Sequence, residues 1–205
     1  MGINLNPKQS SDEDEWTIIR RFNDIICGML IALSPIIIIQ GSLDFLVAII
    51  LVFLNNAIIF DDWWLTSKVI INYKLKPGLL VLITVFYYNA LIFLTIWLLA
   101  VGSRNVPLSG YLIILTAICI IDLFWCYSIH KYSMQKSCDN IEYETENRIQ
   151  IKSWLFVDIV GVILYVMGYL LVSLNNYSLL FTAILICILY FIRRCLDEIA
   201  PRLIK

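Results

Sequence analysis

The chain has 205 residues, of which 60% are hydrophobic, and its mean hydropathy is +0.83. A soluble domain of this length does not carry so much apolar sequence, so the composition excludes an ordinary globular protein and indicates a polytopic membrane protein. The net charge of -1 does not favour nucleic acid as a partner, and we expect no direct contact with it.

Six apolar stretches are separated by loops that are alternately rich in Lys and Arg and nearly free of them. With a cytoplasmic N-terminus, 14 of the 15 basic residues lie inside and only Arg104 lies outside, while Asp44 is the single outer acid. This is the positive-inside pattern of membrane proteins. The sequence therefore predicts an all-α protein of the cell inner membrane, with six transmembrane helices in three hairpins and both termini cytoplasmic.

The first predicted hairpin joins residues 25–40 to residues 45–60. Each stretch has 16 residues, fewer than the ~20 that cross a bilayer, although flanking residues can lengthen both. A full crossing is the favoured interpretation, and a hairpin that enters the membrane without crossing it is the alternative. Pro35 is expected to kink the first helix near its outer end.

The remaining spans are predicted at residues 77–101, 111–128, 154–174 and 179–192. Short outer loops separate them, so the larger polar segments all lie inside. The resulting organisation is an acidic cytoplasmic tail at residues 1–21, a membrane domain at 22–192 with cytoplasmic loops at 61–76 and 129–153, and a cytoplasmic tail at 193–205.

Two cytoplasmic segments have structure-forming patterns of their own. Residues 61–76 place apolar side chains among lysines and predict an interfacial helix that continues the second span. Residues 141–152 alternate with period two, which suggests a small β-hairpin, with a frayed helix as the alternative. An exposed strand offers a backbone edge and apolar anchors to a partner protein. The candidate partner-binding residues are Trp63, Trp64, Ile141, Tyr143, Ile149 and Ile151.

Several aspartates fall near the predicted inner membrane boundary, where ionisable groups are costly and are often functional. Asp24 and Asp158 are expected to cap helix N-termini, and Asp61 is expected in the headgroup layer. Asp122 is different, because it lies near a helix C-terminus after a long uncharged stretch. It requires a cationic partner, such as His130, Lys131 or a base on another helix, and it either stabilises an oligomer or faces the headgroups.

Three amides lie within the predicted spans, at Asn55, Asn56 and Asn89. Amides in lipid form hydrogen bonds between helices, and the same groups can line an ion pore. Packing between helices is the favoured interpretation.

Chemistry-bearing motifs are scarce. The single histidine cannot build a multi-His metal or haem site, and no Gly-rich phosphate loop or nucleophile motif is present. The six cysteines do not form a disulfide framework, since none lies in an outer loop. We expect no enzymatic activity, metal or cofactor.

One short likeness bears on function. Arg21-Phe22-Asn23-Asp24 resembles the first-helix signature of the six-helix potassium channels of endolysosomes and bacteria, and residues 53–57 are faintly similar to their second-helix pattern. The signature serine is replaced by Asn23, both histidines are missing, and the spacing is too short. The likeness covers about ten residues and does not assign the family, but it implies an ion channel as an alternative.

The favoured function is a non-enzymatic, self-associating membrane protein. It senses the state of the bilayer, or anchors and regulates a cytoplasmic protein partner. Small membrane proteins without catalytic motifs accompany soluble effectors in bacterial stress and phage-defence modules, and this analogy extends the prediction to antiviral defence. An oligomeric ion channel and a small-solute transporter are the alternatives.

Overall fold

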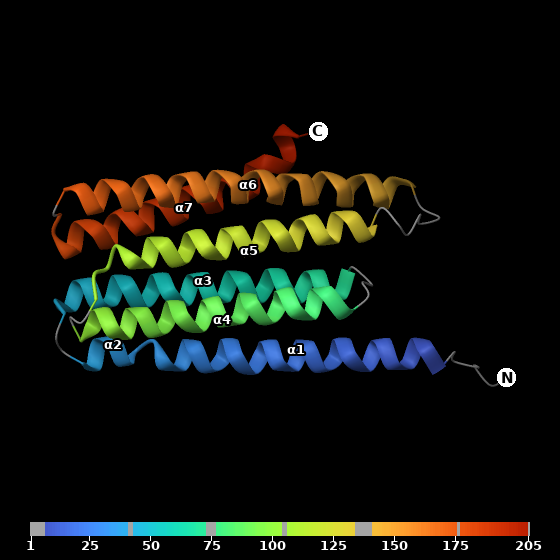
Figure 1. Ribbon diagram of the computed structural model, residues 1–205, viewed down its shortest axis with the longest axis horizontal. Coiled ribbons are helices and arrows are strands. Elements are labelled where there is room, and N and C mark those ends of the chain that lie inside the picture. Colours follow the sequence, from blue (N-terminus) through green and yellow to red (C-terminus); the bar gives the residue numbers. More distant parts are fainter. Residues whose placement is uncertain are drawn as a thin grey trace.

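The computed structural model describes residues 7–40, 43–72, 77–103, 106–133, 141–175 and 177–204. Throughout these ranges the secondary structure is helical, which confirms the all-α prediction (Figure 1). Six helices are long and one is a single turn. In chain order they are α1 (Pro7–Leu33), α2 (Ile36–Ile39), α3 (Phe45–Asn72), α4 (Pro77–Gly102), α5 (Gly110–Ser133), α6 (Ile141–Leu174) and α7 (Leu179–Leu203).

The long helices lie side by side and alternate in direction (Figure 1). We call one end of the bundle the turn end, where α3 and α7 begin and α4 ends. The other is the terminal end, where α1 begins and α3 and α5 end. The most extensive packing joins α5 to α6, with α4 and α7 beside them, while α1 packs against α3 and α4. The contact between α3 and α7 is smaller. We call α1 and α3 one group of helices and α5 and α6 the other; α4 and α7 each contact both groups.

Five of the described helices contain a stretch that is long and apolar enough to cross a membrane: Arg21–Ile39, Thr84–Gly102, Gly110–Ser128, Ile149–Leu174 and Leu179–Leu203. The apolar part of α3, Phe45–Asp61, is shorter. Many large apolar side chains point away from the bundle, as a lipid-facing surface requires. The protein thus has the helices of a membrane protein.

Close approaches between helices occur at glycines. A methyl group at Gly168 of α6 would lie 2.5 Å from a Leu189 methyl of α7, so the leucine side chain occupies the space that a larger residue would need. At the turn end, a methyl group at Gly110 would overlap the indole of Trp97, whose Nε1 donates to the Pro107 carbonyl at 3.1 Å. This contact fixes the connection between α4 and α5.

Two predictions about the first hairpin are confirmed. The first helix is interrupted at Ser34 and Pro35 and resumes as α2, because proline cannot continue the hydrogen-bond ladder. The polar segment that begins at Asp61 continues α3 without a break as far as Asn72. The rest of that predicted segment, residues 73–76, lies outside the described residues.

The β-hairpin predicted at residues 141–152 is wrong. The whole segment forms the first turns of α6, so the alternative of a helix is the one that the structure shows. Ile151 is fully buried, so it is not the exposed anchor expected of a strand. The side chains of Ile141 and Tyr143 lie outside the described part of the chain. Much of the loop predicted at 129–153 is also helical, since α5 extends to Ser133.

The capping roles predicted for Asp24 and Asp158 are wrong as well. Both residues lie well inside long helices, α1 and α6, because each of these helices begins more than a dozen residues earlier than the apolar run indicates. Neither carboxylate is therefore near the free N–H groups of a helix start. Their side chains contact other helices instead.

Candidate functional site: a buried ionic network

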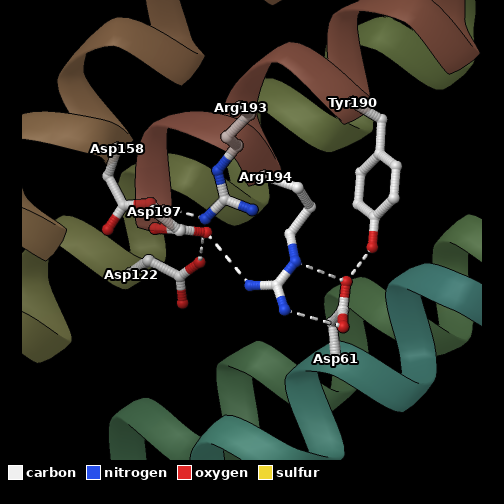
Figure 2. A network of polar contacts seen from close by, with 7 residues as sticks. All are labelled: Asp61, Asp122, Asp158, Tyr190, Arg193, Arg194 and Asp197. Carbon is white, nitrogen blue, oxygen red and sulfur yellow. Dashed lines mark hydrogen bonds and ion pairs between the residues drawn. The ribbon is translucent and has the colours of Figure 1, made fainter. Parts of the chain in front are cut away.

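Arg193 of α7 lies between two aspartates from different helices (Figure 2). Its Nη2 atom is 2.6 Å from Oδ1 of Asp158 on α6 and 3.5 Å from Oδ2 of Asp122 on α5. The three side chains are only 14%, 5% and 11% exposed, respectively. Of the cationic partners considered for Asp122, which were His130, Lys131 and a base on another helix, the structure places Arg193 of α7 beside it.

A glycine makes room for the arginine. Gly161 lies on α6 one turn after Asp158, facing α7 and α5. A methyl group there would lie 3.0 Å from the Cys119 sulfur, 3.2 Å from Cδ of Arg193 and 3.3 Å from its Nε. The absence of a side chain at Gly161 therefore allows the guanidinium to pass over α6 and reach Asp158.

Arg194 faces the other way and contacts α3. Its Nε lies 3.0 Å from Oδ2 of Asp61 and its Nη2 lies 3.1 Å from Oδ1, which is a bidentate guanidinium–carboxylate pair. The hydroxyl of Tyr190 donates to the same carboxylate, and Nη1 of Arg194 lies 3.2 Å from Oδ2 of Asp197. Asp61 therefore joins α3 to α7 through an ion pair, and it is more than an acid in the headgroup layer.

The geometry follows from the spacing along α7. Tyr190, Arg194 and Asp197 are four and three residues apart and share one face of the helix. Arg193 is turned by about 100° from Arg194, since a helix has about 3.6 residues per turn. One face of α7 thus contacts α3, and the adjacent face contacts α5 and α6 (Figure 2).

The network lies about 18 to 27 Å from the turn end, at a rise of about 1.5 Å per residue along α3, α5, α6 and α7. In a hydrocarbon core about 30 Å thick, this depth is on the far side of the midplane. Four carboxylates surround two guanidiniums there. Charges in such a position are costly unless paired, so each ion pair constrains how the four helices fit together. The acids are Asp61, Asp122, Asp158 and Asp197, and the bases are Arg193 and Arg194.

Asn55 lies between three helices. Its side chain is fully buried, donates to the Thr95 hydroxyl at 3.3 Å and accepts from the Tyr111 hydroxyl at 3.3 Å. Asn55 therefore ties α3 to both α4 and α5, which is the geometry that a packing role requires.

The other two amides differ from each other. Asn56 accepts from the Ser34 hydroxyl at 2.6 Å and joins α3 to the break after α1. Asn89 is exposed on the surface of α4, where its Nδ2 donates to the Val85 carbonyl of its own helix at 2.8 Å. Within one copy Asn89 does not bridge two helices among the described residues, and its amide faces outward from α4.

The predicted partner-binding residues are dispersed. Trp63 donates from Nε1 to Asp24 at 2.7 Å and so links α3 to α1, whereas Trp64 is exposed. Ile149 is partly exposed near the start of α6 and Ile151 is buried. The four candidates whose side chains are described therefore do not share one exposed surface.

Sequence reasoning missed the network as a unit. The sequence pattern ends the last span at residue 192 and assigns Arg193, Arg194 and Asp197 to the cytoplasmic tail. A signal was present, since Asp61, Asp122 and Asp158 lie at similar distances from the outer loops of three different spans. Acids at a common depth and a pair of bases at that depth on another helix indicate a shared network.

Within the described residues, no group of three or more His, Cys, Asp or Glu side chains is placed to hold a metal ion. The network can hold helices together, and it can release them when one pair is broken. Comparison with family models, curated proteins and solved structures finds no match. The function is therefore inferred from the geometry of the network.

Proposed function

We propose that the protein is a self-associating inner-membrane protein with six spans, counting the shorter apolar part of α3, and cytoplasmic termini. It senses the state of the bilayer and transmits it to a cytoplasmic partner through α7. The observation that carries the proposal is that adjacent arginines of α7 bind separate groups of helices.

Support for α7 as the transmitting element comes from its packing. Its contact with α3 is small compared with its contact with α6, yet the Asp61–Arg194 pair lies in the smaller contact. A change in bilayer thickness or lateral pressure that separates α3 from α7 acts first on that pair. The end of α7 continues past the network and leaves the bundle axis, with Leu203 exposed (Figure 1).

The terminal end offers surfaces to a partner. Between Asp158 and its start, α6 extends about 26 Å beyond the network, at about 1.5 Å per residue. A helix in this place would bind a partner through side chains at helical spacing, in place of the strand-edge mode expected from sequence. Trp64, on the corresponding part of α3, is also exposed.

Self-association is supported by α4. Asn89 lies on an apolar face with Phe86, Phe93 and Ile96, all of them exposed. An amide that faces lipid is stabilised when it meets the polar group of a second copy, by about 0.6 to 2 kcal/mol. This face is the proposed contact between copies.

The test of sensing uses the protein in lipid nanodiscs, with native cysteines replaced and spin labels at Phe60 of α3 and Leu203 of α7. We expect the distance between the labels to differ between short-chain and long-chain lipids. In Asp61→Asn the distance should no longer depend on the lipid. An unchanged distance in the wild-type protein across these bilayers would contradict a sensor that acts through α7.

The rival function is an ion channel formed between copies, and the exposure of Asn89 favours it specifically. In such an assembly, the amide would face a shared pore and replace part of an ion's hydration shell. Ion flux through liposomes distinguishes the two functions. Flux in the wild type that is lost in Asn89→Leu, with unchanged folding, would replace the sensor by the channel.

A further inference from the structure

A cavity of about 400 Å³ opens at the turn end of the contact between α3 and α7. This volume is within the range of about 300 to 1,000 Å³ that is typical of small-molecule sites. The lining is almost wholly apolar and comes from the starts of α3 and α7, the end of α4 and the segment before α5. The residues are Leu43, Asp44, Val47, Val101, Val106, Pro107, Leu108, Leu179 and Leu180.

Among the described residues that line this cavity, the charged group is the carboxylate of Asp44. Its Oδ1 accepts from the Leu46 backbone N–H at 2.9 Å, which fixes the side chain beside the first turn of α3. Asp44 is also the single acid that the sequence places on the outer side. An apolar volume with one anion at its mouth matches a hydrocarbon chain that ends in a cationic group.

The depth of the cavity identifies the source of such a molecule. The candidate spans of α4 and α7 have their ends at the cavity, so its mouth lies where the headgroups of the adjacent leaflet lie. The first turn of α7 contributes Leu179 and Leu180, and helix N-termini attract phosphate. A positive amine beside Asp44 and a phosphate beside this turn are the two charges of a zwitterionic headgroup.

We propose that this cavity binds a phospholipid with an ethanolamine headgroup, one acyl chain entering the cavity and the amine pairing with Asp44. The cavity and the Asp61–Arg194 pair lie at opposite ends of the same contact between α3 and α7. An acyl chain in the cavity separates α3 from α7 at the turn end. Lipid binding therefore changes the Asp61–Arg194 pair at the other end of the same contact. That coupling rests on the proposed function, whereas the lipid site rests on the cavity itself.

Binding is tested with the purified full chain by native mass spectrometry, after equilibration with equal amounts of ethanolamine and glycerol phospholipids carrying the same acyl chains. We expect retention of the ethanolamine lipid. Asp44→Asn keeps the oxygen that accepts from Leu46 and removes the charge. It should reduce the headgroup preference about two- to fivefold, as an exposed ion pair does.

A larger side chain tests the chain-binding part. Leu180→Trp should fill the cavity and abolish retention, whereas Ile184→Trp, on a lipid-exposed part of α7 outside the lining, should leave it unchanged. Equal retention in the two variants, or no bound lipid in the wild type, would overturn the site. If the wild-type protein is a dimer and Leu180→Trp is a monomer, the cavity is occupied by a second copy of the protein instead of a lipid.

The same preparations separate the site from the proposed function. Lipid retention together with a label distance between α3 and α7 that does not respond to lipid would leave the site established and contradict the sensor. The reverse result is a label distance that responds to bilayer thickness in a protein that retains no lipid. It would support the sensor and contradict the lipid site.

Discussion

Arg193 and Arg194 are consecutive in sequence, yet they bind carboxylates on different helices: Arg193 pairs with Asp158 of α6, and Arg194 pairs with Asp61 of α3. Two neighbouring residues therefore connect α7 to both groups of helices in the bundle. A rotation or tilt of α7 changes both sets of contacts together. This relationship makes α7 the element through which a change at one helix contact can reach the other.

The two partners of Arg193 should contribute unequally to stability. Asp158 is closer to the guanidinium and more deeply buried than Asp122. Asp158→Asn should therefore lower the free energy of unfolding by about 3 to 5 kcal/mol, because it leaves a buried cation poorly paired. Asp122→Asn should cost about 1 to 2 kcal/mol. Denaturant unfolding in detergent measures both, and equal losses would contradict the assignment of Asp158 as the main partner.

Gly161 should be intolerant of a methyl group. Gly161→Ala brings a carbon within 3.2 Å of Arg193, and the resulting overpacking should cost about 1 to 3 kcal/mol of stability. Gly28 is the matched control, since a methyl group there meets no atom within 4 Å. Gly28→Ala should be neutral or stabilising by up to about 1 kcal/mol. If both variants unfold alike, Gly161 does not position Arg193.

Asn55 and Asn89 should separate folding from self-association. Asn55→Leu removes two buried hydrogen bonds and should destabilise the protein by about 1 to 3 kcal/mol. Asn89→Leu should leave unfolding unchanged and reduce chemical crosslinking between copies in the membrane. Destabilisation by Asn89→Leu, with crosslinking preserved, would show that the α4 face is not the contact between copies.

Much of the fold follows from the sequence because hydropathy and proline act locally. The interruption at Pro35 and the start of α5 at Gly110 are examples. The start of α6 could not be predicted in this way. Residues 141–152 alternate with period two, but in the structure they extend the long helix α6 instead of forming strands. The partners of Asp61 and Asp158 also depend on which helices become neighbours. That arrangement is set by packing of α7 against distant segments, and local spacing does not determine it.

Orientation can be tested in whole cells. The distribution of Lys and Arg predicts that Ser103, at the turn end, lies outside and that Ser137 lies inside. In a background without native cysteines, a membrane-impermeant thiol reagent should label Ser103→Cys and not Ser137→Cys. The reverse pattern would place the ionic network on the other side of the midplane and assign the cavity to the cytoplasmic leaflet.

The central claim is that the Asp61–Arg194 pair holds the last part of α7 against α3. Hydrogen–deuterium exchange in nanodiscs tests it most directly, by following the peptide that spans residues 195–204 in the wild type and in Asp61→Asn. We expect faster exchange in Asp61→Asn, because Arg194 and Tyr190 lose their partner on α3. Asp24→Asn, which alters a different helix contact, should exchange like the wild type in this peptide. Equal exchange in Asp61→Asn and the wild type would contradict the account.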